Sequence, residues 1–201
     1  MAVNLWDWKA RSYDLIRRLF PFNLILLKEL RNISELLSET NLNKSRILDV
    51  ATGTGTILKF LPTDCHVFGM DSSRKMLNQA QAKGHQDLVR AKSTALPFKT
   101  SSFQLVTAIG VFEYQQTPLS FLNEMHRVTG ANGFLLLTYS QLGLLNVLRN
   151  LLGQRVYVTK QKTLEPLLHQ SGYAVKQLKQ SLIQTQLLLY KSQNIRDMNT
   201  P

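Results

Sequence analysis

Short apolar runs alternate with segments of helical periodicity in the middle of this chain, and this alternation limits the fold more than any other feature. Apolar runs suited to strands lie at 46–51, 66–70, 88–89, 103–109 and 134–139. Patterns suited to helices lie between them at 57–61, 72–84 and 118–129. Strands that alternate with helices at this spacing predict an α/β fold with a parallel sheet and right-handed crossovers.

The two ends of the chain follow a different rhythm. Helical patterns are predicted at 5–20 and 23–37, before the first strand, and at 141–152 and 160–171, after the fifth. Two further strand-like runs, 173–178 and 184–190, lie close together and predict an antiparallel hairpin at the edge of the sheet. With 201 residues, we expect one compact domain at 43–201 and an N-terminal helical cover at 1–42.

A glycine-containing turn directly follows the first predicted strand. It reads Asp49-Val-Ala-Thr-Gly53-Thr-Gly55, and Asp71 closes the second strand 16 residues after Gly55. Glycines at this place let the backbone approach a ligand, and the next helix begins with unpaired N–H groups. A carboxylate at the position of Asp71 can accept hydrogen bonds from both hydroxyls of a ribose, so the pattern favours a nucleoside ligand.

The same motif distinguishes between nucleosides. A dinucleotide fingerprint requires a third glycine three residues after the second, where this chain has Leu58. The acidic Asp49 would repel a pyrophosphate but suits a ligand with an ammonium and a sulfonium group. Both departures point away from NAD and toward S-adenosylmethionine.

At this point the sequence resembles the Rossmann-like, class I, S-adenosylmethionine-dependent methyltransferases, most closely the ubiquinone/menaquinone C-methyltransferase-like (type 11) branch. The resemblance covers residues 6–140 and rests on ordered motifs, namely Lys9-Ala-Arg-Ser-Tyr-Asp14, Ile47–Gly55, Val67–Leu77, Ala95–Phe98, Phe121–Val128 and Asn132–Leu137. It implies a three-layer sandwich with a mostly parallel seven-stranded sheet, an antiparallel C-terminal edge strand and N-terminal helices covering the site.

The resemblance also implies roles for individual residues, and no metal. Those expected near the methionine part of the cofactor are Asp49, Ala51, Thr52, Gly53, Gly55, Ala108 and Gly110. Those expected near the ribose and adenine are Asp71, Ser72, Met76, Lys92 and Ser93. The family usually has Asp or Asn at the place of Lys92, and a lysine cannot accept a hydrogen bond from the adenine amino group. This departure leaves open a non-catalytic binding or assembly subunit.

Methyl transfer from a sulfonium needs alignment of donor and acceptor more than side-chain chemistry. A base is required only if the acceptor must lose a proton early. The candidates for a catalytic role are Glu113 and Tyr114, after the fourth strand, and Tyr13, which the resemblance places over the site. Tyr139 is a further candidate, whereas His66 and His126 are predicted to be structural.

The charge balance bears on the partner. The chain has 24 Lys and Arg against 13 Asp and Glu, a net charge of +11. An N-terminal segment that combines Trp6, Trp8, Arg11, Arg17 and Arg18 suits a membrane surface. We therefore expect a cytoplasmic methyltransferase with peripheral membrane contact and an apolar, quinone-like or lipid-like acceptor. RNA methylation remains an alternative, which would show steep salt dependence.

The sequence also predicts what the chain lacks. Its single cysteine, Cys65, excludes an internal disulfide framework and a four-cysteine metal site. No apolar run reaches the length of a membrane-spanning helix, and we expect no secretory signal. The oligomeric state is left open.

Overall fold

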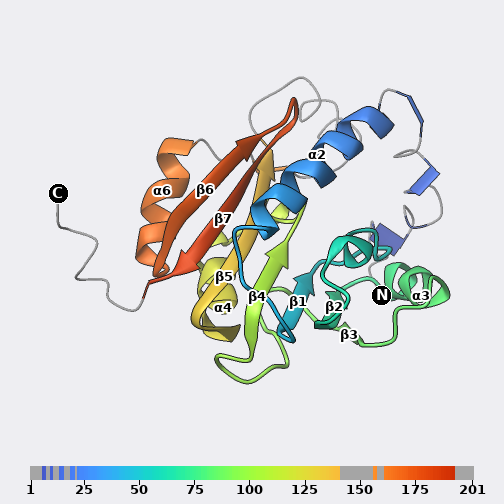
Figure 1. The fold of residues 1–201 in the computed structure, drawn as a ribbon, viewed down its shortest axis with the longest axis horizontal. Coiled ribbons are helices and arrows are strands. Elements are labelled where there is room, and N and C mark those ends of the chain that lie inside the picture. The colour runs from blue at the N-terminus through green and yellow to red at the C-terminus, as the bar shows by residue number, and fades with distance from the viewer. Residues whose placement is uncertain are drawn as a thin grey trace.

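The computed structural model describes residues 22–140 and 161–192, together with residues 6, 7, 10, 14, 15, 19, 20, 156 and 157 (Figure 1). The predicted helix at 141–152 lies outside these residues. The elements are, in chain order, α2 (Phe22–Leu37), β1 (Arg46–Val50), η1 (Ile57–Phe60), β2 (His66–Asp71), α3 (Arg74–Ala82), β3 (Leu88–Arg90), β4 (Phe103–Ala108), η2 (Phe112–Tyr114), α4 (Pro118–Val128), β5 (Thr129–Ser140), α6 (Gln161–Gln170), β6 (Tyr173–Gln180) and β7 (Gln184–Lys191).

The strands form one sheet of seven in the order β3-β2-β1-β4-β5-β7-β6. The first five strands along the chain run parallel, and β7 pairs antiparallel with both β5 and β6. The predicted Rossmann-like, mostly parallel, seven-stranded sheet is confirmed. The antiparallel strand is β7, one place in from the edge that β6 forms, because the C-terminal hairpin inserts its second strand against β5.

Helices cover both faces of this sheet, and strand periodicity decides which residues face which layer. In β5, Leu135 and Leu137 pack in one core cluster with residues of α4 and α6, whereas Leu136 packs in the other with α2 and η1. In β7, Leu188 likewise lies on the α2 side, between two neighbours that face α4 and α6. Successive side chains of a strand point to opposite faces, so these leucine runs belong to strands buried on both sides.

Two local signals set the limits of α3, as the sequence predicts. The Ser73 hydroxyl accepts a hydrogen bond from the Met76 backbone N–H, 3.2 Å away, and caps the start of the helix. Gly84 follows the end of the helix with a φ of +94°, a conformation that glycine adopts without strain. The first turn of α3 is thereby fixed directly after Asp71.

Three predicted elements differ in the structure. The helix expected at 57–61 is the short 3₁₀ helix η1, because Pro62 disfavours helical geometry in the residue before it. The fifth strand begins at Thr129 rather than at 134, and the turn expected at Asn132 lies inside it as an irregularity with a φ of +59°. In the predicted helix at 5–20, the described positions 6, 7, 10, 14 and 15 are helical, whereas 19 and 20 lie in a turn.

α2 runs along the β6–β7 side of the sheet, antiparallel to β6. The Asn32 amide donates to the Gln180 carbonyl at the end of β6, and Lys179 contacts Glu35 one turn further along α2. The helix therefore packs on one face of the sheet near its edge. Within the described residues, no helix is both long enough and apolar enough to span a membrane.

Candidate active site

A cavity of about 340 Å³ opens at the carboxyl ends of β1, β2 and β4. This is the edge at which open parallel sheets bind ligands, since the loops that follow neighbouring strands meet there. Its volume lies in the range of small-molecule and cofactor sites. The lining residues are Trp6, Ala51, Gly53, Met70, Asp71, Ser72, Met76, Ala91, Lys92, Ser93, Thr94, Ile109, Gly110, Val111, Tyr114 and Gln115.

The structure brings most of the predicted site residues together around this cavity. The lining set includes Ala51, Gly53, Asp71, Ser72, Met76, Lys92, Ser93, Gly110 and Tyr114. Other predicted residues lie outside it, namely Asp49, Thr52, Gly55, Ala108 and Glu113. Tyr13 lies outside the described residues.

The loop after β1 is shaped by left-handed backbone conformations. Gly53 has a φ of +58°, and Ala51 has a φ of +60° at the place where the family most often has glycine. A Cβ in this region is strained, so Ala51 retains a conformational cost that glycine would avoid. A Cβ built on Gly53 would meet no heavy atom nearer than the Ala51 carbonyl oxygen, 4.0 Å away. The backbone at Gly53 therefore faces open space.

The same geometry recurs on the opposite wall, in the loop after β4. Gly110 has a φ of +66°, and a Cβ built there would meet nothing within 4 Å. Its backbone N–H donates to the Thr138 hydroxyl on β5, 2.8 Å away, which holds the loop in place. Gly53 and Gly110 thus leave room for a ligand on two sides of one cavity, as a cradle for a nucleoside requires.

Asp71 links the loop after β1 to the start of α3. Its Oδ2 accepts a hydrogen bond from the Gly53 N–H at 2.9 Å, and its Oδ1 accepts one from the Ser73 N–H at 2.8 Å. Burial raises the pKa of this carboxyl group, while the backbone N–H donors act in the opposite direction. A carboxylate has about four lone-pair sites, so this group retains capacity for two ligand hydroxyls.

Asp49 lies beneath the cavity rather than in its wall. It pairs with Thr107 in the register of β1 and β4, and the Thr107 hydroxyl donates to its Oδ1 at 2.6 Å. Its side chain is 2% exposed, and burial raises its pKa to about 6. At neutral pH the group is therefore mostly ionised. Together with Asp71 it places negative charge under the cavity, which suits a cationic ligand and disfavours a pyrophosphate.

The raised pKa of Asp49 predicts a particular pH dependence of stability. The folded protein retains this proton up to about pH 6, whereas the unfolded chain releases it near its usual value of 3.8. The stabilising contribution is present below the lower value and is lost as the pH rises through the higher one. Asp49→Asn keeps an oxygen acceptor for Thr107 and should raise the free energy of unfolding near neutral pH by about 3 kcal/mol.

Urea unfolding of the wild type and Asp49→Asn across this pH range measures the effect. The exposed Asp87 provides the control, because Asp87→Asn should leave the pH profile unchanged. Parallel pH profiles for wild type and Asp49→Asn would contradict the expectation.

Three of the predicted cofactor residues contribute through packing. A Cβ on Gly55 would approach the His85 ring to 2.6 Å and the Ala80 methyl to 3.3 Å, so this glycine permits close contact with α3 and the residues after it. Ala108 is fully buried in the core below Ile109, which lines the cavity in its place. The Thr52 N–H donates to the Met70 carbonyl and connects the loop to β2.

The catalytic candidates separate in the structure. Tyr114 lines the cavity and packs edge-to-face against Trp6, with ring centroids 5.2 Å apart. Glu113 is 2% exposed and lies outside the lining set, where the Ser140 hydroxyl donates to its Oε1 at 3.2 Å. The fully buried Tyr139 likewise lies outside it. Tyr114 is thus the catalytic candidate that the described residues place in the cavity wall.

Trp6 is a cavity residue that motif spacing does not identify. It precedes the glycine loop by more than 40 residues, and it is placed by contacts of its own segment with the domain. Asp7 accepts hydrogen bonds from the Ser73 hydroxyl at 2.5 Å and from the Lys75 N–H at 3.3 Å. Further along, Asp14 accepts from the Thr54 hydroxyl at 2.7 Å and forms an ion pair with Lys83. These contacts fasten the N-terminal segment across the start of α3 and beside the glycine loop.

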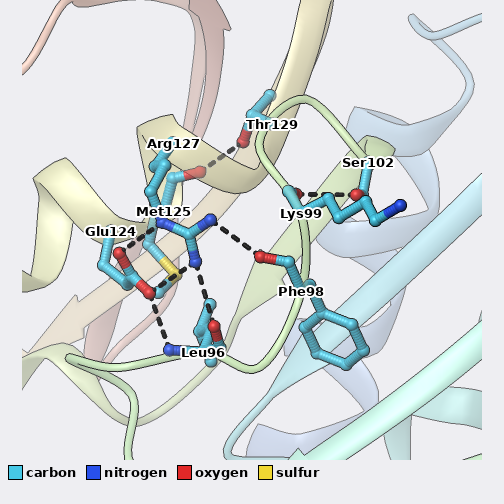
Figure 2. Close-up of polar contacts among 8 residues, drawn as sticks. All are labelled: Leu96, Phe98, Lys99, Ser102, Glu124, Met125, Arg127 and Thr129. Atoms are coloured by element: carbon cyan, nitrogen blue, oxygen red, sulfur yellow. Dashed lines mark hydrogen bonds and ion pairs between the residues drawn. The ribbon is translucent and has the colours of Figure 1, made fainter.

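The wall formed by Lys92, Ser93 and Thr94 is held from α4 (Figure 2). The Arg127 guanidinium donates to the carbonyl oxygens of Phe98 and Leu96 at 2.7 and 3.0 Å, and it pairs with Glu124. Glu124 also accepts from the Leu96 N–H at 2.6 Å, and the hydrogen bond from Arg127 lowers the pKa of its carboxyl group. The loop that continues from the cavity wall is thereby fixed to the helix by a satisfied ionic network.

Comparison with known proteins identifies the class of this domain. Residues 48–137 match a family described as a methyltransferase domain. The chain is 31% identical over 140 residues to the demethylmenaquinone methyltransferase of Thermotoga maritima, covering 68% of this chain. Residues 48–137 form a Rossmann-like, S-adenosylmethionine-dependent methyltransferase domain. The family resemblance seen in the sequence motifs is confirmed, and this methyltransferase domain contains β1 to β4 and most of β5.

The extent of the likeness differs between sequence and structure. The match covers 60% of the Thermotoga relative, and 59% of a ubiquinone/menaquinone biosynthesis C-methyltransferase from Geotalea uraniireducens that is 29% identical over 65% of this chain. The chain therefore spans about three fifths of these relatives. The magnesium protoporphyrin IX methyltransferase of Synechocystis, solved with S-adenosylhomocysteine, has the same fold, with a TM-score of 0.74 over 94% of this chain and 98% of that one, at 17% identity.

Proposed function

We propose that this protein is an S-adenosylmethionine-dependent methyltransferase that acts on a small apolar acceptor, quinone-like or lipid-like. One observation carries the cofactor assignment. Gly53 and Gly110, both in left-handed conformations, face open space on two walls of a cavity in which the Asp71 carboxylate is exposed to a ligand. A nucleoside with a cationic tail fits this combination of backbone clearance and negative charge.

The residues present suit the cofactor in position and chemistry. S-adenosylmethionine supplies an electrophilic methyl group on a sulfonium. Asp71 would accept hydrogen bonds from the ribose hydroxyls, and Met76 and the backbone at Lys92 and Ser93 would contact the adenine. Gly53 and Gly110 would lie against the methionine part, where the ionised Asp49 beneath them favours positive charge.

The catalytic contribution of the protein is then mainly alignment. The side chains of Trp6 and Tyr114 wall the cavity together, so they would orient the acceptor and exclude water. The Tyr114 hydroxyl would be placed to hold an acceptor oxygen during transfer. The buried Glu113 would act through packing rather than on the acceptor.

The apolar acceptor is supported by the lining and by the relatives. Ile109, Val111, Met70 and the Trp6–Tyr114 pair give this side of the cavity an apolar surface. The Thermotoga and Geotalea relatives carry names of quinone-modifying methyltransferases. A prenylated hydroquinone combines an apolar body with a reactive ring position, and it matches such a surface better than a polyanion does.

Two assays test the proposal. Calorimetry should show saturable binding of S-adenosylmethionine, and labelled methyl groups should be transferred to a demethylmenaquinol-type lipid but not to transcribed RNA. Tyr114→Phe and Tyr114→Ala separate the roles of the hydroxyl and the ring. Labelling of RNA, with binding that weakens steeply in salt, would favour the RNA alternative. Absence of cofactor binding would favour a non-catalytic subunit.

A further inference from the structure

The start of α2 and the tip of the β6–β7 hairpin carry large apolar side chains that face solvent. Phe20 is 79% exposed and Leu182 is 91% exposed, and Leu19, Leu24 and Leu27 are each more than half exposed. We call these five residues the apolar rim. Isolated exposed leucines are ordinary on protein surfaces, but a group of this size at one edge indicates an interaction site.

Contacts between α2 and the hairpin place the rim at one edge of the sheet. The Gln186 amide donates to the Glu29 carbonyl, and Asn32 contacts the end of β6 at Gln180. Since α2 runs antiparallel to β6, the residues before Glu29 extend past that end, toward the hairpin tip. Figure 1 shows the start of α2 and the hairpin tip on the same, upper side of the view. The carboxyl ends of β4 and β5, and with them the cavity, lie at this edge.

Basic residues accompany the rim, and acidic residues are missing from the same stretch of sequence. Residues 15–28 contain Arg17, Arg18 and Lys28 and no Asp or Glu. On the outward stripe of α2, the exposed Leu24 and Leu27 are followed by the exposed Lys28 and Arg31. Arg31 is paired with Glu35 at 3.0 Å, so its charge is partly compensated. The whole chain adds a net charge of +11.

We propose that the apolar rim inserts into the surface of an anionic lipid bilayer. Apolar side chains that protrude beside cations are the arrangement of interfacial membrane segments, in which leucine and phenylalanine enter the acyl boundary and lysine and arginine contact headgroups. The rim projects at a helix start and a hairpin tip, whereas the centre of a protein–protein interface is a packed and closely complementary surface. On the proposed function, this orientation also turns the cavity toward the phase that dissolves an apolar acceptor.

Vesicle sedimentation tests the proposal with the full chain. The protein should bind mixed phosphatidylcholine–phosphatidylglycerol vesicles and bind pure phosphatidylcholine vesicles much more weakly. Leu24→Gln/Leu27→Gln should lower the partition coefficient by about tenfold or more, because two apolar side chains no longer enter the bilayer. The matched control is Val175→Gln/Tyr190→Gln, which removes two exposed apolar side chains at the opposite edge of the sheet and should leave partitioning unchanged.

Further readings keep the outcomes distinct. Calorimetry with S-adenosylmethionine should give the same affinity for wild type and both double variants, so lost vesicle binding with intact cofactor binding concerns the rim alone. Failure of the wild type to bind anionic vesicles, or equal losses in both double variants, would overturn the proposal. So would a wild-type dimer in sedimentation velocity that Leu24→Gln/Leu27→Gln abolishes, since the rim would then cover a second copy of the chain.

Discussion

Asp71→Ala should weaken the binding of S-adenosylmethionine by about 100-fold or more. The carboxylate is 7% exposed and is held by the N–H groups of Gly53 and Ser73, so its orientation is fixed before a ligand enters. Two charge-assisted hydrogen bonds to ribose hydroxyls contribute on the order of 3 kcal/mol together, which corresponds to this loss. The variant also releases the Gly53 N–H from its acceptor, which disorders the loop and adds to the effect.

Isothermal titration calorimetry measures this loss, and Asp87→Ala is its control. Asp87 is an exposed carboxylate that contacts His66 and lies outside the cavity wall, so its removal changes charge without touching the site. Circular dichroism should show that Asp71→Ala retains the fold, because burial raises the pKa of this carboxyl group and its removal relieves a desolvation cost. Equal affinity in wild type and Asp71→Ala would refute the assigned role.

Gly110→Ala should weaken cofactor binding by about tenfold or more. The added methyl group would project into the cavity, since nothing lies within 4 Å of the Cβ position in the empty cradle. Filling space that a ligand needs costs 1–3 kcal/mol in typical overpacking, so about a tenfold loss is the lower expectation. The positive φ of +66° adds backbone strain that lowers stability in the free protein.

Gly84→Ala separates strain from steric exclusion. Gly84 also has a positive φ, +94°, and open space at its Cβ, but it follows α3 and lies outside the cavity wall. Both alanine variants should lower the unfolding temperature to a similar extent, whereas only Gly110→Ala should lose affinity for S-adenosylmethionine. Equal calorimetric affinities for the two variants would show that Gly110 is not close to the ligand.

The framework of the site follows from local sequence. Apolar runs and their period fix β1, β2 and β4, and the residue at the end of a buried strand must reach the edge where loops meet. Asp71 and Gly53 were therefore predictable as neighbours of a ligand, because each follows directly from a strand end. Ser73 was predictable as the start of α3 for the same reason, since capping is a contact over three residues.

The tertiary structure decided which side chains reach the cavity. Asp49 and Ala108 occupy expected strand positions, yet packing of β1 against β4 directs both into buried layers. Gly55 permits contact with His85, which motif spacing cannot reveal. Trp6 joins Tyr114 only because Asp7 and Asp14 fasten the N-terminal segment to α3 and the glycine loop.

Periodicity along the chain determined the sheet, the glycine loop and the acidic residue at the end of β2, because these depend on contacts between residues close in sequence. Only the tertiary structure decided the anchoring of the cavity wall by Arg127 and the projection of the start of α2 beyond the end of β6. Both depend on side chains that meet across elements. Local sequence specifies where a strand ends, but packing between layers determines what each neighbouring side chain contacts.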